Sequence, residues 1–530
     1  MAMVKILVAD PISESGFQVF QGNGKFQIDA RQKLPLEELK KAVADVDAII
    51  VRSETKITAE VMAAGPKIKI VGRAGVGVDN IDVVAASRQG IVVVNVPGGN
   101  TISAAEHTVA MLLALSRNIP QANESLRQGE WKRSKFTGTE IQGKILGLIG
   151  LGRIGREVAK RCQSFGMSVI GFDPYTSEEY AKNFNIKLTT LEELYAQADY
   201  ISVHVPLNDS TKHLFNAQTL EKLKPGVRLI NCARGGIYDE KALAEALMSG
   251  HVKGAALDVF ETEPPDKDNP LLSLPNVIVT PHLGASTEEA QVKVAQELAE
   301  TLRDFFLTGA VRNAVNLPAV DAEQYKELEP YLVLCENLGK FVTQMVGGPI
   351  QQLKIEYAGD ISLKNTTPLT LAVLKGFLTP ILGEKVNVVN APHLAKERDV
   401  KWTETKTNQT ADYTSLITLS ATSGTTQYSI SGTLLAKNSP RIVAIDGLSL
   451  DVVPEGTMVI YTNVDKPGVI GYVGTVLGKN KINIAAMQVG RKSSGGEAVT
   501  VVNVDTDVPE AVLKQIREFQ GITLVKCVKL

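Results

Sequence analysis

Short apolar runs alternate with amphipathic stretches through the first half of the chain, and such runs are typical of buried parallel strands. We predict strands at residues 4–9, 48–51, 68–72, 91–95, 145–149, 168–172, 200–205, 228–232, 254–259 and 277–280. Between them lie stretches with apolar residues at helical spacing, among them 36–44, 59–64 and 101–116. Strands that alternate with helices in this way predict an α/β fold with parallel sheets.

A glycine-rich turn follows the strand at 145–149 directly. Gly150 permits the tight turn, Gly152 lets the backbone approach a pyrophosphate, and Gly155 lets the next helix pack close to the strand. The second strand of this unit ends at Asp173, whose carboxylate can accept hydrogen bonds from ribose hydroxyls and would repel a 2′-phosphate. The alternative is a glycine-rich turn in another α/β protein. The strand, helix, second strand and terminal acid together favour a dinucleotide site that prefers NAD over NADP.

Three later strands are followed by residues that suit the oxidation of a hydroxy acid. Arg234, Glu263 and His282 each come after one of them, and the carboxyl ends of parallel strands face one crevice. An arginine fork matches a carboxylate, a histidine can take the hydroxyl proton, and a glutamate can stabilise the imidazolium. The other histidines lack such a setting, and His204 is predicted to pack within its strand. His107 is likewise predicted to be a packed helix residue and no ligand.

The first strands and the segment 131–135 add positive charge. Arg52 and Arg73 stand at strand ends and are candidates for an anion site, although a surface arginine is usually just solvated. The segment 131–135 is either an exposed basic loop or a phosphate contact across a subunit interface.

The second half of the chain is organised differently. A long amphipathic helix at 286–307 is expected to return the chain to the first lobe and make that lobe discontinuous. Helices near 331–345 and 370–382 and strands near 353–357 and 428–435 follow without a chemical motif. The last segment reads as a ferredoxin-like unit, with strands at 459–464, 482–490, 498–504 and 522–529 and helices at 468–479 and 508–519. It lacks the aromatic pattern of RNA-binding sheets, so we expect a regulatory or dimerisation module.

Composition narrows the function classes. The chain has 530 residues, with 56 basic and 58 acidic side chains, so it resembles neither a nucleic-acid-binding nor a membrane-surface protein. No apolar run approaches the ~18 residues of a membrane span. The four cysteines are scattered without metal-ligand spacing, which predicts buried thiols in a reducing cytoplasm and no metal site.

Four motifs identify a family. The segments GLGRIG (150–155), NCARGG (231–236), DVFETEPP (258–265) and TPHLGAST (280–287) resemble the D-isomer-specific 2-hydroxyacid dehydrogenases. The segments 73–80 and 98–117 resemble the branch of that family that acts on 3-phospho-D-glycerate. Residues 463–469 and 482–486 resemble an ACT domain, and the stretch before them resembles the extra domain of the long-form enzymes.

The resemblance implies four domains. A Rossmann doubly wound NAD-binding domain (99–285) would be inserted in a flavodoxin-like substrate-binding lobe (1–98 and 286–318). An α+β intervening regulatory domain (319–453) and a ferredoxin-like ACT domain (454–530) would follow.

The resemblance also assigns site residues. Arg234, Glu263 and His282 would be catalytic. The NAD site would comprise Gly150, Gly152, Arg153, Ile154, Gly155, Asp173, Val205, Cys232, Ala233, Arg234, Asp258, His282 and Gly284. The substrate or its phosphate would contact Arg52, Arg73, Gly75, Val76, Asn100, Arg133 and Lys135. Several relatives carry threonine where this chain has Val76, and Val205 likewise offers no side-chain hydrogen bond. L-Serine would bind as effector at Asn463, Asp465 and Asn483, for which ordinary turn residues are the alternative.

The implied activity is NAD-dependent oxidation of 3-phospho-D-glycerate to 3-phosphooxypyruvate, the entry step of serine synthesis. One alternative is a reductase for another 2-oxo acid, such as hydroxypyruvate, glyoxylate or 2-oxoglutarate. Another is an NAD-sensing scaffold. The resemblance further implies a cytoplasmic homo-oligomer, a dimer or tetramer, with no nucleic-acid or membrane partner.

Overall fold

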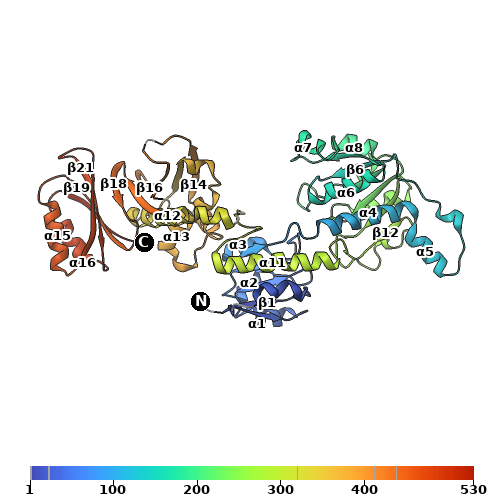
Figure 1. Cartoon of the computed structure of the whole chain (residues 1–530), viewed down its shortest axis with the longest axis horizontal. Coiled ribbons are helices and arrows are strands. Elements are labelled where there is room, and N and C mark those ends of the chain that lie inside the picture. The colour runs from blue at the N-terminus through green and yellow to red at the C-terminus, as the bar shows by residue number, and fades with distance from the viewer. Residues whose placement is uncertain (1–2, 22–23, 319, 321, 411, 437) are drawn as a thin grey trace.

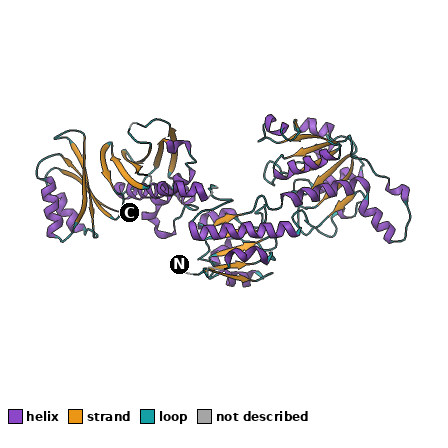
Figure 2. Cartoon of the chain, viewed as in Figure 1, coloured by secondary structure: helices purple, strands orange, loops and turns teal. Residues whose placement is uncertain are grey.

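The computed structural model describes residues 3–21, 24–318, 320, 322–410, 412–436 and 438–530, and the chain forms an elongated row of four sheet-containing bodies (Figure 1). Residue 319, where the intervening domain is predicted to begin, lies outside the described residues. Helices flank the strands on both sides in the first two bodies (Figure 2). No helix within these ranges has the length and apolarity that a membrane span requires. The four described cysteines are free thiols.

The first body holds a five-stranded parallel sheet in the order β2-β1-β3-β4-β5, a flavodoxin-like order. Its strands are β1 (Val4–Val8), β2 (Phe26–Ala30), β3 (Ala48–Val51), β4 (Ile70–Arg73) and β5 (Val92–Val94). Three helices cover one face, namely α1 (Leu36–Val43), α2 (Ala59–Ala64) and α3 (Val83–Gln89). The helix predicted at 286–307 is present as α11 (Glu288–Thr308), and it packs on the other face of this sheet.

The second body holds a seven-stranded parallel sheet in the order β12-β11-β10-β9-β6-β7-β8. Its strands are β6 (Ile145–Ile149), β7 (Ser168–Phe172), β8 (Lys187–Leu188), β9 (Tyr200–Val203), β10 (Val227–Asn231), β11 (Val252–Leu257) and β12 (Val277–Val279). Its helices include α4 (Thr101–Arg117), α5 (Ile119–Arg127), α6 (Arg153–Ser164), α7 (Glu178–Lys182), α8 (Leu191–Gln197), α9 (Ala217–Glu221) and α10 (Glu240–Met248). The order reverses between β6 and β9, so the doubly wound prediction is confirmed and the ligand crevice lies beyond the carboxyl ends of these strands.

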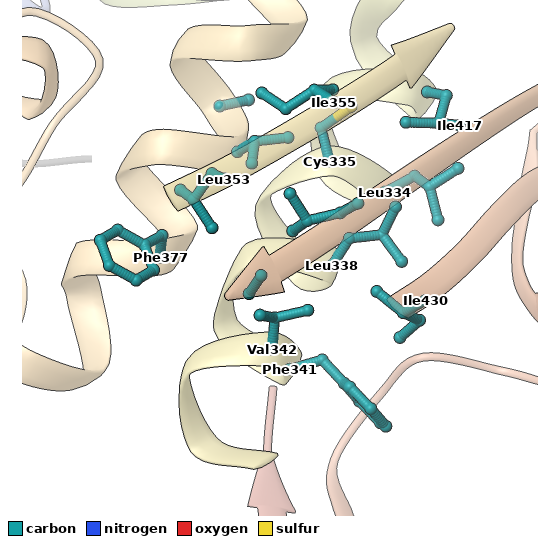
Figure 3. Packing of buried hydrophobic residues seen from close by; sticks show 14 of the residues in the cluster. Leu334, Cys335, Leu338, Phe341, Val342, Leu353, Ile355, Phe377, Ile417 and Ile430 are labelled. Carbon is teal, nitrogen blue, oxygen red and sulfur yellow. The ribbon is translucent and has the colours of Figure 1, made fainter. Parts of the chain in front are cut away.

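The third body has a six-stranded sheet in the order β14-β13-β15-β16-β17-β18. Its elements are α12 (Ala322–Val346), β13 (Gln352–Gly359), α13 (Thr367–Leu382), α14 (Ala391–Glu397), β14 (Lys401–Thr407), β15 (Ser415–Ser423), β16 (Thr426–Leu435), β17 (Ser439–Ile445) and β18 (Leu448–Val452). Figure 3 shows Leu334 and Leu338 of α12 and Phe377 of α13 among the side chains that pack with the sheet. The predicted start at 331 is wrong, because α12 continues back through Pro330.

The last body has the expected ferredoxin-like order, with β19 (Thr457–Val464), α15 (Val469–Lys479), β20 (Ile484–Arg491), β21 (Glu497–Val504), α16 (Glu510–Arg517) and β22 (Ile522–Lys529). Its antiparallel sheet runs β20-β21-β19-β22. Two helices cover one face, and apolar residues of the other face, among them Ile460 and Val501, belong to the core of the third body. The Gln344 side chain of α12 also bonds the backbone N–H and C=O of Lys529 at 3.0 and 2.9 Å. The last two bodies therefore share one core.

A short segment joins this C-terminal half to the first lobe. Val389 is buried in the core under the sheet of the first lobe, and Val388 packs at its margin. The Asn387 amide donates to the carbonyl of Gly90 at 2.8 Å. The side chains of Asn387 and Asn390 also bond the backbone of residues 385–390, which makes this turn rigid. We call residues 387–390 the valine plug.

The crossing of α12 and α13 generates a stability prediction. A Cβ on Gly376 would lie 2.0 Å from the carbonyl oxygen of Glu336, so Gly376→Ala should destabilise the protein by about 1–3 kcal/mol. Gly474 lies on α15, and apart from the neighbouring backbone of its own helix no described atom lies within 4 Å of its Cβ position. Gly474→Ala should therefore stabilise α15 by about 0.5–1 kcal/mol. Urea unfolding would measure both, and equal effects of the two substitutions would contradict the close crossing.

Candidate active site

The glycine-rich turn has the geometry that a pyrophosphate needs. Gly150 has φ of +93°, and a Cβ there would lie 2.5 Å from the carbonyl oxygen of His204. A Cβ on Gly155 would lie 2.2 Å from the carbonyl oxygen of Gly150, so the helix can approach the strand only without a side chain. Gly152 precedes α6, and nothing described lies within 4 Å of its Cβ position. The N-terminus of α6 is therefore open to an anion.

Asp173 follows β7 as predicted and stands beside this turn. Its carboxylate accepts hydrogen bonds from the N–H of Leu151 at 2.8 Å and of Tyr175 at 2.9 Å. These bonds tie the glycine turn to the end of β7. The same carboxylate is only half-buried, so it can accept further hydrogen bonds from the crevice.

Other predicted cofactor residues surround the turn. Arg153 begins α6 and lines a hollow between the two lobes with Gly98, Thr101 and Asn313. Ile154 packs on the core beneath, and the Val205 side chain lies beside Gly150. Burial raises the pKa of the Cys232 thiol to about 12 and lowers the pKa of His204 to about 4. His204 is hydrogen-bonded to Ser202 at 3.0 Å, in agreement with the expected packing role.

The imidazole of His282 and the carboxylate of Glu263 meet. His282 Nδ1 lies 2.7 Å from Glu263 Oε2, and the other oxygen of Glu263 accepts from the Phe260 N–H at 3.2 Å. Burial favours the neutral form of Glu263, but the hydrogen bonds and the charge of His282 outweigh it and hold the pKa of Glu263 below its usual value. The pair therefore contains an ionised carboxylate, and Nε2 of His282 remains for a substrate.

A buried carboxylate shapes the turn that carries His282. Asp258, 1% exposed, accepts hydrogen bonds from the N–H groups of Leu283 at 2.7 Å and Gly284 at 2.8 Å, and from the hydroxyl of Thr280. His282 itself has φ of +55°, a left-handed conformation that these bonds help to maintain. Burial acts to raise the pKa of Asp258, yet the bond to His107 and the other donors hold it below its usual value.

His107 does more than the sequence indicated. Its Nε2 lies 3.1 Å from the Thr280 hydroxyl and 3.2 Å from Asp258, which links α4 to the turn with His282. His107, Cys232 and Asp258 place one nitrogen, one sulfur and one oxygen within 4.8 Å of one another. Burial favours the neutral thiol of Cys232, and the Asp258 carboxylate already accepts N–H and O–H groups, so the described contacts are those of a hydrogen-bonded cluster.

Three arginines gather at the ends of strands from two different sheets. Arg234 follows β10, and its Nε donates to Asp79 across the cleft at 3.2 Å. Arg73 ends β4, and burial, with nearby Arg234 and Arg52, lowers its pKa to about 10. The loop of Arg52 is held by Asp10, a buried acid that accepts the Arg52 N–H at 2.6 Å. Sequence reasoning missed Asp10 and Asp79, although Asp79 lies in the motif that carried the resemblance.

The remaining substrate candidates divide into two groups. Gly75 and Asn100 line a hollow together with Arg52, and Oδ1 of Asn100 is buried there without a partner in the described residues. The backbone carbonyl of Val76 accepts from the Asn95 amide. Arg133 and Lys135 lie in a short 3-10 helix (Arg133–Phe136) that follows α5, and the arm that carries α5 lies at the end of the molecule away from the ACT domain (Figure 1). Lys135 lines a hollow with Arg228 and Pro275 there, so one chain does not bring it to the three arginines.

The effector candidates are also divided. Asn463 and Asp465 lie at the end of β19, where Asp465 pairs with Arg491 at 2.5 Å and Oδ1 of Asn463 is buried without a described partner. Both Asn463 and Arg491 align with Ala498 of β21. Asn483 precedes β20 and donates to Asp505 at 2.7 Å, at the opposite end of the sheet. One chain therefore does not assemble the predicted serine site.

Comparisons with known proteins agree with this geometry. Residues 109–284 match the model of the D-isomer specific 2-hydroxyacid dehydrogenase, NAD binding domain. Residues 327–446 match the D-3-phosphoglycerate dehydrogenase intervening domain, and residues 457–521 match the ACT domain. Among solved structures, a glyoxylate reductase from Paecilomyes thermophila is 30% identical with a TM-score of 0.55, covering 59% of this chain and 98% of that one. A D-lactate dehydrogenase from Aquifex aeolicus complexed with NAD and lactic acid is 29% identical with a TM-score of 0.52, covering 59% of this chain and 100% of that one.

Full-length relatives extend the match to the whole chain. The D-3-phosphoglycerate dehydrogenase of Methanocaldococcus jannaschii is 45% identical over 529 residues, which is 100% of both chains. That of Bacillus subtilis is 44% identical over 528 residues, again 100% of both. This protein therefore binds NAD in its second body and belongs to the D-3-phosphoglycerate dehydrogenase family, a long form of the D-isomer specific 2-hydroxyacid dehydrogenases.

Proposed function

We propose that this protein catalyses the NAD-dependent oxidation of 3-phospho-D-glycerate to 3-phosphooxypyruvate, the first step of L-serine synthesis by the phosphorylated pathway. The observation that carries the proposal is the 2.7 Å contact of His282 with Glu263 in a chain that gathers three arginines at the cleft. The names of the full-length relatives favour this substrate over glyoxylate, hydroxypyruvate or 2-oxoglutarate. The complete acid–base pair favours an enzyme over an NAD-sensing scaffold.

Each catalytic side chain has its own role in the proposed reaction. The guanidinium of Arg234 binds the substrate carboxylate and places C2 in the crevice. His282 Nε2 takes the proton of the C2 hydroxyl, while the Glu263 carboxylate stabilises the resulting imidazolium. Bound NAD supplies the acceptor for the hydride that leaves C2 as the carbonyl forms. Gly150, Gly152 and Gly155 would let the pyrophosphate lie at the N-terminus of α6, and Asp173 would hold the ribose.

The second anionic group of the substrate needs positive charge beyond Arg234. Arg52 and Arg73 supply it from the same chain. Arg133 and Lys135 reach a substrate only from a partner subunit, because their own cleft lies away from the arm. This requirement supports a homo-oligomer in which the arm beyond α5 contacts a second copy.

L-Serine is the proposed effector of the ACT domain. The strand β20 is an edge of its sheet, so two copies could pair β20 with β20 in antiparallel fashion. The start of one β20 would then lie beside the end of the other, which brings Asn483 of one copy toward Asp465 of the next. The unpartnered Oδ1 of Asn463 supports a polar ligand at that place. We also propose the cytoplasm as the site of action, since a serine-pathway enzyme with free thiols suits it.

A turnover assay tests the proposed activity. Purified protein with NAD should form NADH, followed by its near-ultraviolet absorbance, with 3-phospho-D-glycerate as substrate. D-Glycerate, D-lactate and 2-hydroxyglutarate should react at least about tenfold more slowly in kcat/KM, because they lack the phosphate. Tight NAD binding without turnover of any of these acids would instead support the scaffold.

The acid–base pair generates a pH prediction. Glu263→Gln should lower kcat about a hundredfold, and the acidic limb of the oxidation profile should move to lower pH. The reason for the shift is that the imidazolium form of His282 would lose its carboxylate partner. Glu261→Gln is the matched control, because this acid lies on the same loop and pairs with His213 at 3.3 Å. An unchanged limb in Glu263→Gln would refute the pairing, and His282→Ala should abolish turnover while NAD affinity stays within about twofold.

Cofactor choice should depend on the charge of Asp173. Leu151 and Tyr175 bond different oxygens of Asp173, so Asp173→Asn keeps an acceptor for one of these two N–H groups while it removes the repulsion of a 2′-phosphate. We expect the ratio of kcat/KM for NAD to that for NADP to fall about tenfold or more. Asp173→Ala should relax the preference as well and also weaken NAD binding, since the turn loses its hydrogen bonds. An unaltered cofactor ratio in both variants would exclude this role.

A further inference from the structure

Two adjacent residues to which the proposed reaction assigns no role each hold one arginine of the cleft. Oδ2 of Asp79 accepts the Nε–H of Arg234 at 3.2 Å. Oδ1 of Asn80 accepts the Nε–H of Arg73 at 3.0 Å. The two arginines belong to different sheets, yet neighbouring residues of one loop bind the same atom of each.

Bonding at Nε leaves the ends of both guanidinium groups available. Arg234 gives one further N–H to the carbonyl of Ala233 at 2.6 Å, so three of its five donors remain among the described contacts. Those terminal nitrogens are the part of the fork that suits a carboxylate or phosphate. The Nε bonds therefore fix the side chain without consuming the atoms that recognise an anion.

Two glycines of the same loop make space for these side chains. A Cβ on Gly77 would lie 2.0 Å from Nη2 of Arg234, and a Cβ on Gly75 would lie 2.5 Å from Nη1 of Arg73. Neither glycine has a positive φ, so the backbone here does not require glycine. The missing side chains serve to let the two guanidinium groups lie over the loop.

Asn80 also fixes the backbone around the third arginine. Its amide donates to the carbonyl of Arg52 at 3.1 Å and to that of Thr55 at 2.7 Å. Three guanidinium groups of like charge repel one another, and an unanchored arginine would turn toward water. Hydrogen bonds at Nε and the loop that Asn80 fixes keep the three guanidinium groups close together before the substrate binds.

We propose that Asp79 and Asn80 are positioning residues that hold Arg234 and Arg73 by Nε, so that two guanidinium ends face the two anionic groups of one substrate. Asp79 also spans the cleft, since it lies on the substrate lobe and Arg234 on the nucleotide-binding domain. The inference rests on the proposed function in one respect, namely that the substrate carries a carboxylate and a second anion.

The decisive measurement is the KM for 3-phospho-D-glycerate. Asp79→Ala and Asn80→Ala should each raise this KM about tenfold or more, because each removes a hydrogen bond that orients an arginine toward the substrate. The kcat and the NAD affinity should stay within about threefold of wild type. Asp79→Asn keeps an oxygen for the Arg234 Nε–H and should stay within about threefold of wild type. Glu54→Gln is the control for loss of charge, since Glu54 is exposed on the same lobe and contacts none of the three arginines in the described structure.

A variant that adds one methyl group distinguishes a misplaced Arg234 guanidinium from a misfolded protein. The atoms nearest to the methyl group of Gly77→Ala would be the flexible ends of Arg234 and Asp79, so the fold should persist while the guanidinium moves. We expect the same rise in KM with an unchanged melting temperature. The exposed Asp79 pair should likewise contribute little to stability, because its carboxylate side chain is 64% accessible.

Competitive inhibitors that carry a single anionic group test whether Arg234 binds the carboxylate and Arg73 binds the phosphate. D-Glycerate carries only the carboxylate and glycerol 3-phosphate only the phosphate. Asp79→Ala should weaken competitive inhibition by the first more than by the second, and Asn80→Ala the reverse. A fall in KM in Asp79→Ala would show that Asp79 merely repels the substrate and would overturn the proposal, as would wild-type KM in both alanine variants. Absence of turnover in the wild-type protein would instead count against the proposed function.

Discussion

Positive charge held at the ends of strands from two separate sheets is the constraint on which this site depends. Parallel strands end at one edge, so β3 and β4 deliver Arg52 and Arg73, and β10 delivers Arg234. The chain crosses between the two lobes near α4 and α11 (Figure 1), and Asp79 of one lobe bonds Arg234 of the other. Burial, together with the like charges of Arg234 and Arg52, lowers the pKa of Arg73, and these charges would separate without anchors. Acids and amides of the loops supply those anchors.

On the nucleotide-binding side of the cleft, hydrogen bonds likewise fix the position of a reactive side chain. The acid–base histidine lies on a turn whose backbone N–H groups point into the buried carboxylate of Asp258. That carboxylate would be costly to bury alone, and its donors, including His107 from α4, compensate for its desolvation. The left-handed backbone at His282 is maintained by the same bonds. The reactive side chain is thus half-exposed on top of a fully satisfied polar core.

The sequence predicted the catalytic half better than the regulatory half, for a physical reason. Strands buried on both faces give unbroken apolar runs, and all of those predicted before residue 280 are present. The strands β2 and β8 were missed, because β2 is an exposed edge strand and β8 has only two residues. Four of the six strands of the third sheet were missed as well, since half-exposed strands rich in Thr and Ser give a weak signal.

The site residues also divide into those that the sequence could predict and those that it could not. The contact of His282 with Glu263 could be expected, because both follow strands of one sheet and face one crevice. Asp10, Asn80 and His107 could not, since each acts through a hydrogen bond to a residue far along the chain, and neither spacing nor periodicity records such pairs. The separation of Arg133 from Arg73, and of Asn483 from Asp465, likewise depends on tertiary placement. A motif shows which residues matter but not whether one chain brings them together.

The valine plug connects the C-terminal half of the chain to the substrate lobe through packed and hydrogen-bonded contacts. Val389 completes the core beneath the sheet of the substrate lobe, and Asn387 bonds Gly90, the residue that ends α3. Asp82 caps the other end of α3, and Asn80 and Asp79 lie two and three residues before that cap. One short helix therefore separates the plug from the residues that hold Arg234 and Arg73. Because the ACT sheet shares its core with α12, the last strand of the chain is linked to the third body, and the plug links that body to the substrate lobe. A displacement of the C-terminal half that strains the plug would act first on Gly90 and α3, which stand between the plug and the loop with the arginine anchors.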